Sequence, residues 1–217
     1  MASKKASVFS FLPLYNLVSA LAWGYVLYQV IDVYPKIGQP AFFIATKDLV
    51  TAVQCGAIVE VLNSLFGIVR APIVTTAAQV ASRLLVVIGI FKYLPEAENA
   101  HKIYYVTLLS AWSIAEIVRY MFYFFNLVSE APKLLVILRY NMFYVLYPLG
   151  VGSELLIVYS ALNIAEAKYN TYYKWFLIAG MLAYIPGFPV LFTHMVAQRK
   201  KVMRSLREGK TKTTKKA

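Results

Sequence analysis

The chain is poor in cysteine, histidine and acidic residues. Its 217 residues include one cysteine, two histidines and ten acids. The single thiol, Cys55, excludes an intramolecular disulfide framework, and the scattered His101 and His194 give no support to a zinc site or a Cys/His nucleophile. We therefore expect Cys55 to be a small packed hydrophobe, and we expect neither a metal ion nor a cofactor.

Charge is also scarce: 15% of the residues are charged, 60% are hydrophobic, and the mean hydropathy is +0.61. A water-soluble domain of this length could not bury so much apolar surface. No connection between apolar segments is long enough to be a second domain. The composition predicts an all-α, polytopic membrane helix bundle, because helices satisfy their own backbone hydrogen bonds in lipid.

Six apolar segments approach or exceed the roughly 18 to 20 residues that span a hydrocarbon core of about 30 Å. They are Val8–Val33, Leu49–Ile68, Val74–Phe91, Ile103–Leu127, Leu134–Leu162 and Tyr173–Ala197. The fifth is long and carries Pro148, Gly150 and Gly152, which favour a single kinked span. Two half-helices, or two full spans giving seven in all, stay open.

The net charge of +12 comes mostly from the end of the chain. We divide the chain into a single transmembrane domain, residues 1–197, and a basic tail, residues 198–217. With an even number of spans, this tail and Lys4 and Lys5 place both termini in the cytosol. In a membrane chain such a tail predicts contact with the lipid bilayer and its anionic headgroups, or a role in topology alone, rather than binding of nucleic acid.

Glu154 is the most informative residue, since a carboxylate within an apolar segment is costly and faces a bundle interior or a wet cavity. Tyr147 precedes it by seven residues, so on a helix both side chains share one face. A phenol and a carboxyl in one cavity form a plausible acid/base pair. The alternative is a tyrosine that caps a glutamate used only for helix packing.

A second polar cluster lies in the fourth segment. Glu116 and Arg119 are i, i+3 neighbours that can neutralise each other, which predicts a structural ion pair. The functional alternative is that Arg119 or Tyr120 orients a substrate near Glu154. Arg83, in the third segment, needs a partner, which is either Glu60 or a phosphate-bearing ligand.

Several blocks occur in order along nearly the whole chain. They are Tyr15-Asn16, Trp23-Gly24, Glu60-Val61-Leu62, Gln79-Val80-Ala81-Ser82-Arg83, Ala111-Trp112-Ser113, Glu116-Ile117-Val118-Arg119-Tyr120, Arg139-Tyr140, Leu146-Tyr147-Pro148-Leu149-Gly150 and Glu154-Leu155. In order and spacing they resemble the very-long-chain (3R)-3-hydroxyacyl-CoA dehydratases, formerly called protein tyrosine phosphatase-like proteins, and especially the plant pasticcino-type members.

The resemblance implies a lyase of the endoplasmic reticulum membrane that catalyses the third step of fatty-acid elongation. Its substrate would be a very-long-chain 3-hydroxyacyl-CoA, and its partners the condensing enzyme and the ketoacyl and enoyl reductases. The family's catalytic tyrosine and glutamate fall on Tyr147 and Glu154. Our hypothesis is that Glu154 removes the proton at C2 and Tyr147 donates to the C3 hydroxyl, although the reverse stays open.

Further residues are candidates for substrate binding. They are Arg83, Glu116, Arg119, Tyr120 and Arg139, of which the arginines could receive the phosphates of CoA. The ending Lys212 to Ala217 does not match a dilysine retrieval signal cleanly, so the location depends on the resemblance.

Three rival functions remain. A non-catalytic scaffold for elongation enzymes would not need Tyr147 and Glu154, and a transporter would show broken helices in both halves of a repeat, which we do not find. A phosphotyrosine-binding protein is the third. The phosphatase signature would place a cysteine nucleophile where Ser64 stands, followed by Gly67 and Arg70, and a serine cannot supply a low-pKa thiolate.

Overall fold

The computed structural model describes residues 5–69 and 73–214, and every regular element in this part of the chain is helical. In order, the elements are α1 (Phe11–Tyr28), the π-helix η1 (Gln29–Val33), α2 (Tyr34–Ile37), α3 (Ala41–Cys55), α4 (Ile58–Leu65), α5 (Ile73–Leu84), the π-helix η2 (Leu85–Lys92), the 3-10 helix η3 (Glu98–His101), α6 (Ile103–Val128), α7 (Lys133–Asn141), α8 (Phe143–Lys168) and α9 (Thr171–Thr214). The predicted all-α fold is confirmed.

Six helical stretches are long and apolar enough to cross a membrane. They are Phe11–Ile37, Ala41–Leu65, Thr75–Lys92, Ile103–Val128, Phe143–Lys168 and Thr171–Leu206. The first and third stretches include the π-helical turns η1 and η2, where the backbone hydrogen bonds pass over one more residue than in an α-helix. The prediction of six spans is confirmed.

The fifth apolar segment differs from its predicted limits. It divides at Met142 into the short helix α7 and the membrane-spanning helix α8, which continues beyond the predicted end at Leu162 to Lys168. α8 runs unbroken through Pro148, so the two half-helices expected as an alternative do not form at this proline. The signal for this break in the sequence is Arg139-Tyr140-Asn141, a polar stretch that separates the apolar residues 134–138 from the apolar start of α8.

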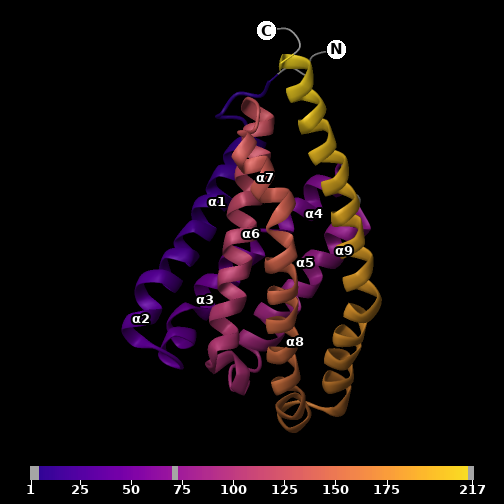
Figure 1. Ribbon diagram of the computed structural model, residues 1–217. Helices are drawn as coiled ribbons and strands as arrows, with labels where there is room; N and C mark the ends of the chain where they lie inside the picture. The colour runs from indigo at the N-terminus through magenta and orange to yellow at the C-terminus, as the bar shows by residue number, and fades with distance from the viewer. Residues whose placement is uncertain (1–4, 70–72, 215–217) are drawn as a thin grey trace.

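Four long helices, α1, α6, α8 and α9, follow one another across the bundle, and α3, α4 and α5 lie behind them (Figure 1). α6 packs against both α1 and α8, and α8 packs against α9. The start of α1 and the end of α9 lie at the same end of the bundle (Figure 1), where the Ala6 N–H donates to the Leu127 carbonyl at 2.9 Å. We refer to this as the terminal end, and to the α8–α9 connection as the opposite end.

An aromatic core fastens the start of α6 to α3 and η2. The rings of Phe42, Phe43 and Phe91 meet the Tyr105 ring edge to face, with centroids 5.0 to 5.8 Å apart. The Tyr105 hydroxyl also lies 2.9 Å from the Thr46 hydroxyl. Since lipid tails are as apolar as these side chains, such ring packing and interhelical hydrogen bonds hold membrane helices together where water exclusion cannot.

Exposed ion pairs lie at the opposite end of the bundle. Lys168 at the end of α8 donates to Glu96 at 2.7 Å, and this hydrogen bond holds the pKa of Glu96 below its usual value. Lys102 and Glu98 form a second pair at 2.5 Å. Both pairs are open to solvent, so each contributes little to stability.

Candidate active site

Glu154 lies on the inner face of α8 with only 6% of its surface exposed. Its Oε1 accepts a hydrogen bond of 2.8 Å from the indole Nε1 of Trp112 on α6. Its Oε2 accepts a second hydrogen bond from the phenol of Tyr184 on α9. The carboxylate is therefore held through both oxygens by two neighbouring helices, which offsets the cost of burying it.

Tyr147 lies two turns before Glu154 on α8, and both side chains line the same cavity, as their spacing predicts. The Tyr147 ring stacks on Phe188 of α9, with centroids 4.8 Å apart and planes at 11°. A more distant stack on Phe192 follows at 6.4 Å. These rings fix the plane of the phenol without occupying its hydroxyl. The catalytic roles of Tyr147 and Glu154 remain predictions.

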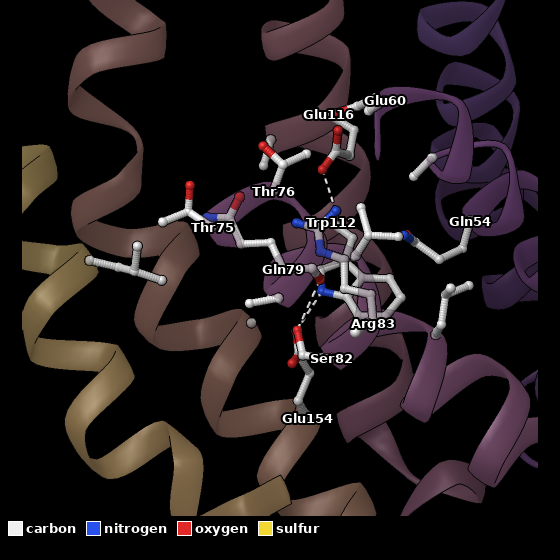
Figure 2. Close-up of a pocket in the computed structure, with 18 of the residues that line it drawn as sticks. Gln54, Glu60, Thr75, Thr76, Gln79, Ser82, Arg83, Trp112, Glu116 and Glu154 are labelled. Atoms are coloured by element: carbon white, nitrogen blue, oxygen red, sulfur yellow. Dashed lines mark hydrogen bonds and ion pairs between the residues drawn. The ribbon is translucent and has the colours of Figure 1, made fainter. Parts of the chain in front are cut away.

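Arg83 forms an ion pair with Glu116, from α5 to α6. The prediction that Arg83 pairs with Glu60 is therefore wrong, because its guanidinium pairs with Glu116 instead. The Arg83 Cζ also lies 5.1 Å from the centroid of the Trp112 ring. Figure 2 shows Arg83 and Trp112 between the carboxylates of Glu116 and Glu154. The site thus contains one continuous series of contacts from Glu116 to Glu154.

Arg119 binds two carboxylates, those of Glu116 and Glu60. Its Nε donates to Glu116 at 2.7 Å, so the predicted i, i+3 pair is present. Its two terminal nitrogens donate to both oxygens of Glu60 on α4, at 2.6 and 2.7 Å. Tyr120 also donates to Glu60. Arg119 and Tyr120 therefore contact Glu60 rather than Glu154, and a role for either residue in orienting a substrate beside Glu154 stays a prediction.

Arg139 lies on α7, nearer the terminal end. Its guanidinium stacks over Phe122 and Tyr123, 4.7 Å from each ring centroid, and donates to the Tyr123 hydroxyl at 3.0 Å. The Arg139 Nε is buried and has no hydrogen-bond partner among the described residues. Arg139 lines the cavity. In the described part of the chain, no ion pair joins its guanidinium to a carboxylate.

The cavity has a volume of about 1930 Å³. Side chains from every spanning stretch line it, and most of these side chains are apolar. It also contains most of the residues predicted for the site: Tyr147, Glu154, Arg83, Glu116, Arg119 and Arg139. Tyr120 is buried behind them, with 2% of its surface exposed. The volume exceeds that of a typical small-molecule pocket, so a large ligand would fit.

The sequence reasoning missed two residues that contact Glu154. Trp112 belongs to one of the blocks that carry the family resemblance, and Tyr184 lies in the sixth apolar segment, but neither is among the residues that the sequence predicts for the site. A phenol in the middle of an apolar span is itself a signal, since its hydroxyl requires a partner in lipid. The sequence alone does not say which partner.

Among the described residues, no three His, Cys, Asp or Glu side chains form a group that could hold a metal ion. The expected absence of a metal remains a prediction. Arg70, the last residue of the phosphatase-like signature, lies outside the described residues.

The fold and the site define a class of protein: a polytopic helical membrane protein in which a buried carboxylate and a charge network face a large cavity. A family model described as "Protein tyrosine phosphatase-like protein, PTPLA" matches residues 54–205. The chain belongs to this family.

Curated relatives match along most of the chain. A protein of Schizosaccharomyces pombe named "Probable very-long-chain (3R)-3-hydroxyacyl-CoA dehydratase" is 40% identical over 197 residues, which cover 88% of this chain and 92% of the relative. The "Very-long-chain (3R)-3-hydroxyacyl-CoA dehydratase hpo-8" of Caenorhabditis elegans is 36% identical, covering 91% and 96%. The "Very-long-chain (3R)-3-hydroxyacyl-CoA dehydratase PASTICCINO 2A" of Oryza sativa subsp. japonica is 35% identical, covering 89% and 92%. No solved structure matches the chain.

Proposed function

We propose that this protein is a lyase that removes water from very-long-chain (3R)-3-hydroxyacyl-CoA to give the trans-2-enoyl-CoA. The names of its relatives support this activity, and the match along nearly the full length of both chains supports carrying it over. The observation that carries the proposal in the structure is a buried carboxylate, Glu154, that shares a large cavity with the phenol of Tyr147. A non-catalytic scaffold would not require that pair.

In the proposed reaction, the Glu154 carboxylate takes a proton from C2, next to the thioester carbonyl. The electron pair of the broken C–H bond forms the C2–C3 double bond, while the C3–O bond breaks. The departing oxygen takes the phenolic proton of Tyr147 and leaves as water. Return of the proton from Glu154 to Tyr147 restores both groups, so no further reactant is needed.

Trp112 and Tyr184 would hold the carboxylate while it acts. Each donates one hydrogen bond to one oxygen, which fixes the plane of the carboxyl group and leaves a lone pair on each oxygen free. A base held in one orientation reacts with less reorganisation than a mobile one. The Glu116–Arg83 pair beside Trp112 would keep the indole in place.

We place the enzyme in the endoplasmic reticulum membrane with both termini in the cytosol. Six spanning stretches support a multi-pass protein, and the position of the two described chain ends at one side of the bundle supports termini on the same side of the membrane (Figure 1). Arg139, near the terminal end, would then meet the phosphates of CoA on the cytosolic side. The condensing enzyme and the two reductases of the elongation cycle are the partners we expect there.

The test is an assay of purified protein in lipid nanodiscs with 3-hydroxyacyl-CoAs of graded length, in which the 2-enoyl product is measured. Glu154→Gln and Tyr147→Phe should each lower turnover by about 10²- to 10⁴-fold, the usual contribution of a general acid or base. The matched controls on the same helix are Glu166→Gln and Tyr159→Phe, both at exposed positions, which should retain activity. Wild-type protein without product at any chain length would refute the proposed activity.

A further inference from the structure

The cavity extends along the length of α9, well beyond the surroundings of Glu154. Its lining on this helix begins at Tyr172 and continues to Gln198, which at about 1.5 Å per residue corresponds to about 39 Å. This length is comparable to the thickness of a bilayer. Tyr184, which donates to Glu154, lies close to the middle of that stretch. The carboxylate therefore divides the cavity into two halves.

The two halves differ in chemistry. The half towards the terminal end contains Arg139, His194 and Gln198. The half towards the α8–α9 connection, which we call the lower half, is lined by apolar side chains and glycines until it reaches a cluster of tyrosines. Its walls include Leu85, Ile88, Gly89, Phe176 and Gly180. None of the described residues that line this half carries a charge.

The walls of the lower half are η2 and α9, and they touch at two glycine positions. The Tyr173 hydroxyl donates to the Gly89 carbonyl at 2.7 Å. A Cβ atom built at Gly180 would lie 3.5 Å from Cδ1 of Leu85. Elsewhere α9 packs mainly on α8 and α7. The interface between η2 and α9 is therefore small, and parting these two walls would break few contacts between them.

We propose that the acyl tail of the substrate occupies this lower half, between η2 and α9, and that the two helices part along the Leu85/Gly180 and Gly89/Tyr173 contacts to admit it. The inference rests on the proposed function. The reacting carbons of a 3-hydroxyacyl-CoA lie between a charged head and an apolar tail. With C2 at Glu154 and the phosphates in the half that contains Arg139, the tail continues past the carboxylate into the uncharged half. The apolar walls exclude water from the tail and give it van der Waals contacts.

A reversible cross-link tests the parting of the walls. Leu85→Cys and Gly180→Cys are combined with Cys55→Ala, so that the two new thiols are the only ones, and they are joined by a short bifunctional methanethiosulfonate that reductant removes. Activity is compared between a very-long-chain 3-hydroxyacyl-CoA and the shortest one that the protein turns over without the cross-link. The cross-linked protein should lose at least tenfold in kcat/KM on the long substrate relative to the short one, and reductant should restore the ratio.

The controls are the two single-cysteine variants treated with the same reagent. An unchanged ratio of long-chain to short-chain kcat/KM after cross-linking would overturn the inference, as would an equal loss on both substrates. Absence of turnover by the wild-type protein on every substrate would instead refute the proposed function, so the two failures are distinguishable.

A second measurement does not depend on the cysteine variants. A 3-hydroxyacyl-CoA with a photoreactive diazirine at the end of its tail is bound to Glu154→Gln protein and irradiated, and the modified residues are mapped by mass spectrometry. Adducts should fall within residues 85–89 and 173–180. Adducts confined to the half that contains Arg139, or to outward positions of α9 such as Leu182 and Ile185, would overturn the inference.

Discussion

Tyr184 on α9 donates a hydrogen bond to Oε2 of Glu154 on α8, so the last helix of the chain completes the surroundings of the buried carboxylate. The two residues are 30 positions apart in the sequence. They meet because the short α8–α9 connection makes these helices antiparallel neighbours. Through this contact, α9 contributes a side chain to the candidate active site in addition to lining the cavity.

Removing the Tyr184 hydroxyl should slow the reaction while leaving substrate binding in place. A hydrogen bond to a charged group contributes about 1.5 to 3 kcal/mol, and its loss corresponds to about a 10- to 100-fold lower kcat. Steady-state kinetics of Tyr184→Phe should show this decrease with little change in KM. The exposed Tyr159→Phe on α8 serves as the control. A kcat equal to that of the wild type would show that the Tyr184 hydroxyl does not orient the base.

Trp112 and Tyr184 should act on the same carboxylate as a unit. Trp112→Phe removes the Nε1 donor to Oε1 of Glu154, and we expect about a tenfold lower kcat. The double variant Trp112→Phe/Tyr184→Phe should be less impaired than the product of the two single effects predicts, because either loss already frees the carboxyl group to rotate. A double-mutant cycle on kcat measures this coupling, with the exposed Trp175→Phe as control. Fully independent effects would contradict the shared role.

The ion pairs of Arg119 with Glu60 and Glu116 should contribute more to stability than to catalysis. Arg119→Met leaves Glu60 and Glu116 without a shared cation, and breaking such a pair costs about 3 kcal/mol, the lower end of the usual range because a quarter of the Arg119 side chain is exposed. Thermal unfolding in detergent should show the loss, and Arg119→Met/Glu60→Gln should recover part of it.

The exposed pair at the opposite end provides the comparison for that experiment. Lys168→Met breaks a contact of similar length with Glu96 but should change the stability by less than about 1 kcal/mol. Equal effects of Arg119→Met and Lys168→Met would mean that the buried network contributes no more than a surface ion pair.

Local patterns in the sequence predict those parts of the site that lie on one helix. The seven-residue spacing of Tyr147 and Glu154 places both in one cavity, and the i, i+3 spacing of Glu116 and Arg119 gives their pair. Apolar segment length likewise predicts the six spans. Contacts between helices are different, because they depend on how each helix is rotated about its axis.

The pairing of Arg83 illustrates the limit. The sequence predicts either Glu60 or a phosphate as its partner, whereas in the bundle Arg83 pairs with Glu116 and Glu60 pairs with Arg119. From the sequence alone, more than one carboxylate is a suitable partner for Arg83 and for Arg119. Only the packing of α4, α5 and α6 decides between them, and residue spacing in a single sequence does not predict that packing.

Arg139 should contribute to binding of the CoA head rather than to the chemistry at C2. A buried Nε without a partner and the absence of a neutralising carboxylate in the described ion pairs leave this guanidinium able to receive a phosphate. Arg139→Gln should raise KM for 3-hydroxyacyl-CoA by about tenfold, the equivalent of about 1.4 kcal/mol of lost binding, with kcat nearly unchanged.

A truncated substrate separates this role from a structural one. The 3-hydroxyacyl-N-acetylcysteamine thioester keeps the reacting carbons and the tail but has no phosphates, so its kinetics should be the same for Arg139→Gln and wild type. Arg204→Gln, at an exposed position of α9, is the control for loss of one positive charge near the terminal end. If Arg139→Gln impaired both substrates equally, the guanidinium would be holding α7 in place through Phe122 and Tyr123 rather than binding a phosphate.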